Sequence, residues 1–164
     1  MKKTNILVIF IILYSLVLYS CDFLLPWIIE FDKERFDKEW TAWEAQGIVN
    51  YSVTQQEEGV AGYFRVVRIV VEDNEIIEIE DMIEGYELMI SSWDKTISGF
   101  YNWVNEKYES RERKGKSIRV EYNEEYHYPE YIDISYMSLE GGVGVAGPTI
   151  RLFEFIPLAP EAGK

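Results

Sequence analysis

Three runs rich in β-branched and aromatic residues follow one another in the first half of the chain, with only a few residues between them. Residues 49–57 alternate apolar and polar side chains, and residues 63–72 and 75–80 are joined by Asp73-Asn74, a pair typical of tight turns. Parallel strands need a crossover of a dozen or more residues, so connections this short exclude parallel pairing between these runs. The pattern therefore predicts a meander of three antiparallel strands.

Two helices are predicted, one before this meander in the sequence and one after it. The first begins after Asp32, whose carboxylate can accept N–H groups of the first turn, and it ends at Gly47, which suits a left-handed cap. The second begins after Thr96, another capping residue. Apolar residues recur with helical period in both helices: Phe36, Trp40 and Trp43 in the first, and Ile97, Phe100, Tyr101, Val104 and Tyr108 in the second. Each helix therefore has one apolar side to bury.

The second half of the chain adds further strands. Residues 117–122 and 130–137 alternate again, residues 149–155 can form a last strand, and the glycine-rich residues 141–147 are expected to form a mobile loop. The order is thus helix, three strands, helix, two or three strands. We predict an α+β fold in which an antiparallel sheet of five to six strands carries both helices on one face. A chain of 164 residues fits one domain of this kind, expected over residues 31–157.

The N-terminus has the pattern of a secretory signal. Two lysines give it a positive start, and residues 6–18 are almost wholly apolar. At 1.5 Å per residue this run spans about 20 Å, which is short of the roughly 30 Å hydrocarbon core of a bilayer. We therefore predict a cleaved signal peptide over residues 1–20, not a transmembrane anchor, and a tether over residues 21–30. At the other end, residues 158–164 are expected to form a flexible tail.

Leu18, Tyr19, Ser20 and Cys21 resemble the lipobox of bacterial lipoproteins, in which Leu, two further residues and Cys mark the cleavage site. The resemblance implies that the signal peptidase recognises the first three residues, that the Cys21 thiol receives a diacylglycerol, and that the new amino group takes an acyl chain such as palmitate. Several acyl chains hold a protein on a membrane durably, since each buried CH₂ contributes about 0.8 kcal/mol. The expected location is a bacterial membrane, with the domain facing the periplasm or the cell exterior. A chance cysteine after an ordinary signal peptide is the alternative.

Several short signatures further along resemble a family of bacterial secreted proteins and lipoproteins known only as a domain of unknown function. The matching pieces are Trp43 with Gly47, Asn50-Tyr51-Ser52, the strand pair around Val66–Ile79, Thr96-Ile97 with Phe100, Val120-Glu121-Tyr122, and Tyr128-Pro129 with Ile132 and Ile134. Their order carries the resemblance, which covers roughly residues 36–137. His127 stands where such proteins usually have Gly, and Ser135 stands where an Asp is common. The resemblance implies a compact α+β domain at the cell envelope and supplies no activity.

The charge and the rare residue types narrow the classes of function. A net charge of −13 argues against nucleic-acid binding, which depends on cations that neutralise phosphates. One cysteine excludes an internal disulfide, and one histidine excludes a His-rich zinc site. Arg111, Arg113 and Lys114 form the only concentrated positive charge, and we interpret them as cations at the negative end of the second helix. The glycines of residues 141–147 lack the Lys-Ser/Thr pair of a phosphate loop, and we expect no cofactor.

No assembled catalytic set is visible in the sequence. His127 is the only histidine, and no nucleophile motif such as G-x-S-x-G accompanies it. Six acids without EF-hand spacing cluster around the predicted turn at Asp73-Asn74, and we interpret them as a solvated face and not as a calcium site: Glu72, Asp73, Glu75, Glu78, Glu80 and Asp81. Among 29 acids, however, pairs spaced for glycoside hydrolysis can arise by chance. We predict no catalytic residue and no metal, and we favour a protein that is not an enzyme.

Tyrosines crowd the region of the last predicted strands. By alternation, Tyr122 and Tyr136 face the core. The other aromatic side chains there form a candidate binding surface for a protein or a glycan: Tyr126, His127, Tyr128 and Tyr131. Packing at the sheet edge is the simpler account of the same residues.

The leading hypothesis is a lipid-anchored, non-enzymatic domain of the cell envelope that binds or scaffolds another envelope component. One alternative is an envelope hydrolase that uses paired carboxylates. Another is a small-ligand or inhibitor-like module, since small α+β sheets with helices on one face often present a concave side.

Overall fold

A computed structural model of the protein describes residues 29–59, 64–83, 94–110, 116–136 and 145–159. Several predictions lie outside these residues, namely the signal peptide with Leu18, Tyr19, Ser20 and Cys21, the basic residues Arg111, Arg113 and Lys114, most of the glycine-rich segment and most of the C-terminal tail. No helix in the described residues is long and apolar enough to cross a membrane.

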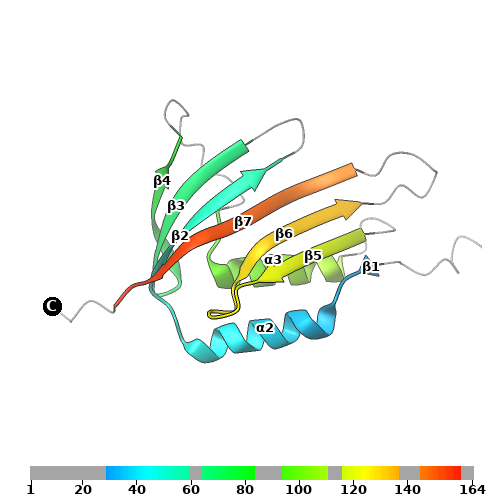
Figure 1. The fold of residues 1–164 in the computed structure, drawn as a ribbon, viewed down its shortest axis with the longest axis horizontal. Coiled ribbons are helices and arrows are strands. Elements are labelled where there is room, and N and C mark those ends of the chain that lie inside the picture. The colour runs from blue at the N-terminus through cyan, green and yellow to red at the C-terminus, as the bar shows by residue number, and fades with distance from the viewer. Residues whose placement is uncertain (1–28, 60–63, 84–93, 111–115, 137–144, 160–164) are drawn as a thin grey trace, which may run out of the picture.

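The described residues form seven strands and two helices (Figure 1). In chain order the elements are β1 (Ile29–Glu30), α2 (Lys33–Gln46), β2 (Tyr51–Glu58), β3 (Phe64–Glu72), β4 (Glu75–Asp81), α3 (Ile97–Glu109), β5 (Lys116–Tyr122), β6 (Pro129–Tyr136) and β7 (Val145–Pro157). After the short β1, the chain thus makes the same succession of one helix and three strands twice. The predicted α+β class is confirmed.

The sheet is mixed and has one strand more than the longest prediction. Its strand order is β1-β5-β6-β7-β2-β3-β4, and within the described residues only β1 runs parallel to its neighbour. Ile29 pairs with Lys116 and Glu30 with Ser117. The prediction of a purely antiparallel sheet of five to six strands is therefore wrong. The parallel pair is possible because both helices and a whole meander separate β1 from β5, which leaves ample chain for a crossover.

The last strand is longer than predicted, and it begins inside the glycine-rich segment. Gly147 lies in β7, where a Cβ atom would stand 2.1 Å from the Ile134 carbonyl oxygen of β6. Glycine is needed at this position because only a residue without a side chain lets the two backbones come so close. The prediction of a mobile loop over residues 141–147 is wrong for this glycine.

Local signals placed both helix starts, the end of α2 and one turn correctly. The Asp32 carboxylate accepts a hydrogen bond from the Arg35 N–H at 3.0 Å, and Gly47 has a left-handed φ of 62°. Thr96 Oγ1 accepts from the Gly99 N–H at 3.0 Å. Asp73-Asn74 forms the predicted turn with φ values of 49° and 63°. The six acids around this turn are exposed, except for the half-buried Asp81.

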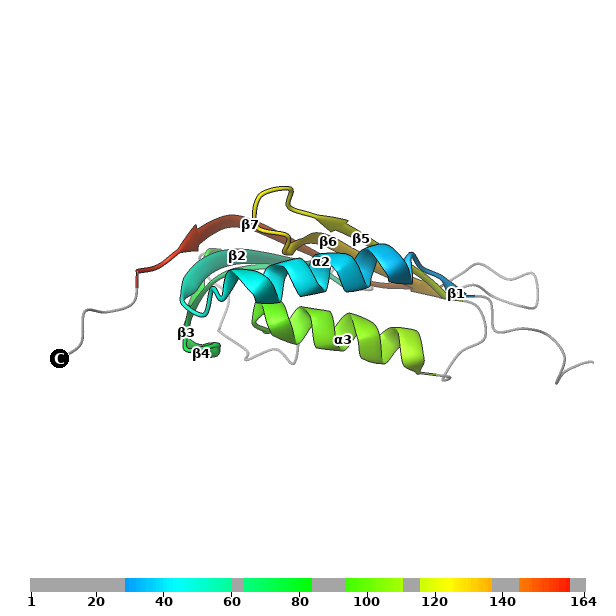
Figure 2. The ribbon, with the colours of Figure 1, turned by 90° about the horizontal axis from the view of Figure 1, so that it is seen from below.

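Figure 2 shows α3 on one side of the sheet, and ring contacts of Phe36 with Tyr101 and of Trp43 with Tyr51 pack α2 against the same core. In Figure 1, α3 lies behind the strands, while α2 runs beside the β5 edge. The core fills the space between the two layers, and its fully buried members include Phe36, Tyr51, Ile69, Ile97, Phe100, Tyr101, Ile132, Ile134 and Ile150. The other face of the sheet carries no helix among the described residues. The outer edge of β5 lies next to α2.

Candidate functional site

Strand β5 is covered at its start and open beyond it. Because β1 reaches only Lys116 and Ser117, no described strand pairs with the outer edge of β5 from Ile118 to Tyr122. Strand β4, at the opposite edge of the sheet, has four carboxylates among its seven residues, and such charges discourage pairing with another chain. In β5 only Glu121 is acidic. The exposed charges of β5, Arg119 and Glu121, pair with each other, so this edge does not carry the concentrated negative charge of β4.

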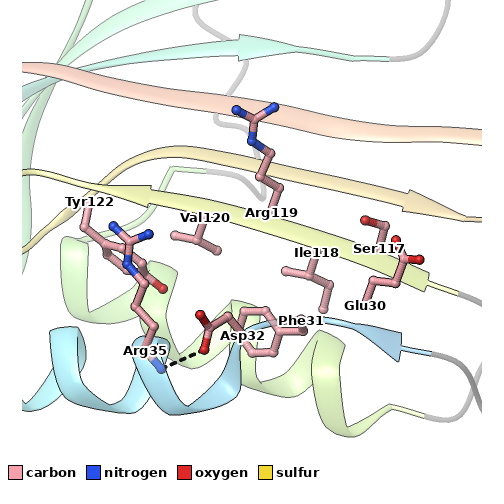
Figure 3. A pocket seen from close by; sticks show the side chains of 9 residues that line it. All are labelled: Glu30, Phe31, Asp32, Arg35, Ser117, Ile118, Arg119, Val120 and Tyr122. Carbon is pink, nitrogen blue, oxygen red and sulfur yellow. Dashed lines mark hydrogen bonds between the residues drawn. The ribbon is translucent and has the colours of Figure 1, made fainter.

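A groove of about 330 Å³ lies along the open edge (Figure 3). It is lined by Glu30, Phe31, Asp32, Arg35, Ser117, Ile118, Arg119, Val120 and Tyr122. Figure 3 shows the side chains of Ile118 and Val120 on the helix side of β5, whereas the Arg119 side chain points away from α2. Apolar side chains of β5 together with Phe31 thus form the floor of the groove, and charged side chains form its rim.

The rim carries opposite charges at its two ends. Glu30 lies beside Ser117 at one end, and Arg35 lies beside Tyr122 at the other (Figure 3). The Arg35 guanidinium carbon is 5.4 Å from the centroid of the Tyr122 ring, a cation–π distance. Within the described residues Arg35 forms no ion pair, and the nearby Asp32 carboxylate accepts from its backbone N–H at 3.0 Å. Arg35 is therefore positioned on an aromatic ring with its guanidinium N–H donors available.

A stack of aromatic rings supports the Arg35 end of the groove. The rings of Trp40 and Tyr101 are 5.5 Å apart with an angle of 10° between their planes, and those of Tyr101 and Tyr122 are 6.4 Å apart with an angle of 12°. Burial raises the pKa of both phenols above the ordinary value, and Arg35 lowers that of Tyr122 only in part. Both hydroxyls therefore stay protonated at neutral pH and do not act as bases. The arrangement suits binding.

The four residues of the predicted binding surface do not form one surface. Tyr131 lies with its ring between two arginines, at 5.7 Å from Arg119 and 4.9 Å from Arg151. Tyr126 is half-buried, with its ring 4.9 Å from that of Phe155. The two tyrosines thus belong to different packing environments.

Tyr128 is only 4% exposed and belongs to the core, so its predicted exposure is wrong. Its ring lies 5.0 Å from that of Phe155. The reason is the backbone of His127, whose φ of 59° turns the chain just before β6 and directs the next side chain inward. The alternation used for prediction does not extend through such a turn. Tyr122 is buried as predicted, and Tyr136 is half-buried.

His127 joins the β5–β6 turn to α2. Its Nδ1 atom lies 2.7 Å from Glu39 Oε2, and its side chain is 36% exposed. The Tyr101 hydroxyl donates to the His127 carbonyl oxygen. Within the described residues, no Ser, Thr or Cys side chain hydrogen-bonds to the imidazole. The contacts found here connect two elements and bring no nucleophile to the ring.

Sequence reasoning missed the groove and its charged residues. Glu30 and Arg35 are ordinary charged residues in a tether and in a helix, and they come near β5 only through the fold. The one signal available in the sequence was the contrast between the four acids of β4 and the single acid of β5. No group of three His, Cys, Asp or Glu in the described ranges could hold a metal ion.

Comparison with protein families matches residues 35–139 to a family of unknown function, DUF6174. These residues include both helices except for the first two residues of α2, and all strands except β1 and β7. Neither curated proteins nor solved structures give a match to the chain. The resemblance drawn from the short signatures is confirmed as membership of a family without a known role, and the groove geometry has to supply the argument for function.

Proposed function

We propose, for a chain that belongs to the family of unknown function DUF6174, that the protein is a lipid-anchored domain of the cell envelope which binds another envelope component in the groove beside β5. The carrying observation is the combination of an open strand edge, an apolar floor and a charged rim in one recess. Binding sites commonly combine an apolar lining with a few placed polar groups in this way.

The lipobox-like sequence supports the envelope part of the proposal. If Cys21 carries the lipid, about eight residues connect it to Ile29, and at roughly 3.4 Å per extended residue they reach at most about 28 Å. The domain would then stay close to the bilayer, with β1 as its point of attachment. A partner in the same membrane could reach the groove, which begins at the end of β1.

The anchor is tested by mass spectrometry of the processed protein and by labelling with radioactive palmitate. We expect label on the wild type, an N-terminus at Cys21 and the mass of a diacylglycerol with an amide-linked chain. The Cys21→Ser variant should take up no label. An unmodified thiol or an uncleaved leader would contradict the anchor.

The groove is tested by photo-cross-linking in cells, with a photoreactive amino acid placed at Glu30. A matched control carries the same group at Glu75, an exposed position on the opposite edge of the sheet. We expect a discrete adduct from position 30 that is lost when Arg35→Glu is added, and none from position 75. Equal adducts from the two positions, or adducts that ignore Arg35, would contradict binding in the groove.

A further inference from the structure

The groove has the shape and chemistry to hold a strand, an inference that rests on the proposed binding function and makes it specific. We propose that it takes an extended peptide segment which runs parallel to β5, with a positive group at the Glu30 end and a carboxylate at the Arg35 end. The peptide would continue the line that β1 leaves when the chain turns into α2, where the Lys33 N–H bonds the Phe31 carbonyl at 3.1 Å.

The open edge of β5 supplies the backbone part of this recognition. An edge strand presents a row of N–H and C=O groups, and a peptide that adds as a further strand satisfies them. From Ile118 to Tyr122 such a peptide would extend about 17 Å at 3.3 Å per residue, or about five residues, and a sixth residue at its start would lie beside Glu30. The direction of β1 shows that a parallel neighbour fits this edge.

A single strand fits better than the edge of a second folded copy. Helix α2 runs beside the β5 edge, and Figures 1 and 2 place it where the sheet would continue. If a second copy of the protein brought its own β5 edge to this one, the α2 helices of both copies would lie between the two sheets. A peptide strand brings no helix of its own, and only part of it has to enter the groove of about 330 Å³ between β5 and the first turn of α2.

The charged rim and the apolar floor of the groove determine the direction of the bound peptide and the kinds of side chain that it carries. A peptide parallel to β5 begins near Glu30 and ends near Arg35, so an early cation and a late carboxylate each meet an opposite charge. An arginine fork binds a carboxylate in bidentate fashion, and the Tyr122 ring holds Arg35 in position. Side chains beside Ile118 and Val120 face the helix side and should be apolar.

The probe that meets these requirements is the blocked hexapeptide acetyl-Lys-Val-Thr-Val-Thr-Glu-amide with a fluorescent label on its acetyl end. Fluorescence anisotropy is measured with the full-length processed lipoprotein in detergent micelles. We expect saturable binding, and at least a tenfold weaker affinity with Arg35→Glu. Binding of the variant should recover when the final Glu of the probe is replaced by Lys. Arg68→Glu changes an exposed residue of β3, far from the groove in the strand order; this control should bind the original probe like the wild type.

Two further probes test for strand addition. In a β-ladder every second N–H of the peptide points to its neighbour, so N-methylation of one alternate set of amides should abolish binding while methylation of the other set leaves it intact. Equal affinities of the two methylated probes would overturn the proposal, as would an affinity that is the same for the wild type and for Arg35→Glu. So would sedimentation showing a dimer that Arg35→Glu dissociates, because the occupant would then be a second copy. If the Glu30 adduct forms in cells but the probe does not bind, this inference fails while the proposed function stands.

Discussion

Tyr51 caps a helix from a distant strand. Its hydroxyl, buried in β2, accepts a hydrogen bond from the Ile97 N–H at 2.8 Å, across 46 positions of the sequence. The first four N–H groups of a helix have no partner within it, and Thr96 satisfies only the one on Gly99. The start of α3 therefore depends on a local cap and on a contact that only the folded chain provides.

We expect Tyr51→Phe to lower the free energy of unfolding by about 1–3 kcal/mol, because it leaves a buried N–H without an acceptor. Urea unfolding followed by circular dichroism measures this loss. Tyr131→Phe is the matched control, since no hydrogen bond to the Tyr131 hydroxyl is present among the described residues. A loss of the same size in both variants would contradict the capping role of Tyr51.

For single residues, a role could be predicted from the sequence only when the partner lies a few positions away along the chain. Asp32 and Thr96 bond to N–H groups three positions away, so a rule about neighbouring residues found them. Tyr51 and Arg35 act on partners that are far along the sequence, and nothing adjacent to them indicates those partners. The same limit explains why the groove was missed.

Lys116 terminates helix α3 although it belongs to the following strand. It is 1% exposed, and its Nζ donates to the Lys107 carbonyl at 2.9 Å and to Ser110 Oγ at 2.7 Å. A cation at this position meets the negative end of the helix dipole and the free carbonyl groups there. Arg111, Arg113 and Lys114, for which this role was predicted, lie outside the described residues.

We expect Lys116→Met to cost about 1.5–3 kcal/mol, the range for hydrogen bonds to a charged group. The last turn of α3 should also exchange its amide hydrogens faster, which hydrogen-exchange mass spectrometry detects. The exposed Lys38→Met in α2 serves as the control and should change neither quantity appreciably. Unchanged exchange near Lys107 in the Lys116 variant would contradict its role at the helix end.

Elements defined by strong periodicity were predictable, and those defined by pairing were not. The meander and both helices have repeating apolar positions, and their bounds agree with the prediction to within a few residues. Strand β1 has two residues, too few to show any period, and exists because β5 offers an edge. The start of β7 looks like a loop because the close approach to β6 requires Gly147.

On the scale of the whole molecule, the buried phenols predict how stability depends on pH. Burial raises the pKa of Tyr51 and Tyr128 to about 12, and it raises those of Tyr101 and Tyr122 as well. In the unfolded chain these groups ionise near pH 10. The unfolded state therefore releases protons first as the pH rises, and the native state loses stability.

Below pH 10 the buried phenols should leave the free energy of unfolding unchanged. Between pH 10 and pH 12 we expect it to fall steadily, because the phenols ionise in the unfolded chain and not yet in the native one. Urea midpoints at pH 9, 10.5 and 11.5 measure the fall. In Tyr51→Phe, the decline should be shallower because one such group is gone. A stability that stays level through this range would show that the phenols ionise as easily in the native state.

The position of β7 has a consequence for the order in which the molecule can be made. It is the fourth of seven strands in space and the last in the chain, and it alone joins β5–β6 to β2–β3–β4. Until residue 157 has left the ribosome or a translocation channel, the two halves share no backbone ladder. Closing the sheet then requires partners about 100 residues apart to meet, which makes folding slow. The sheet is therefore completed only after the last of its seven strands has been released.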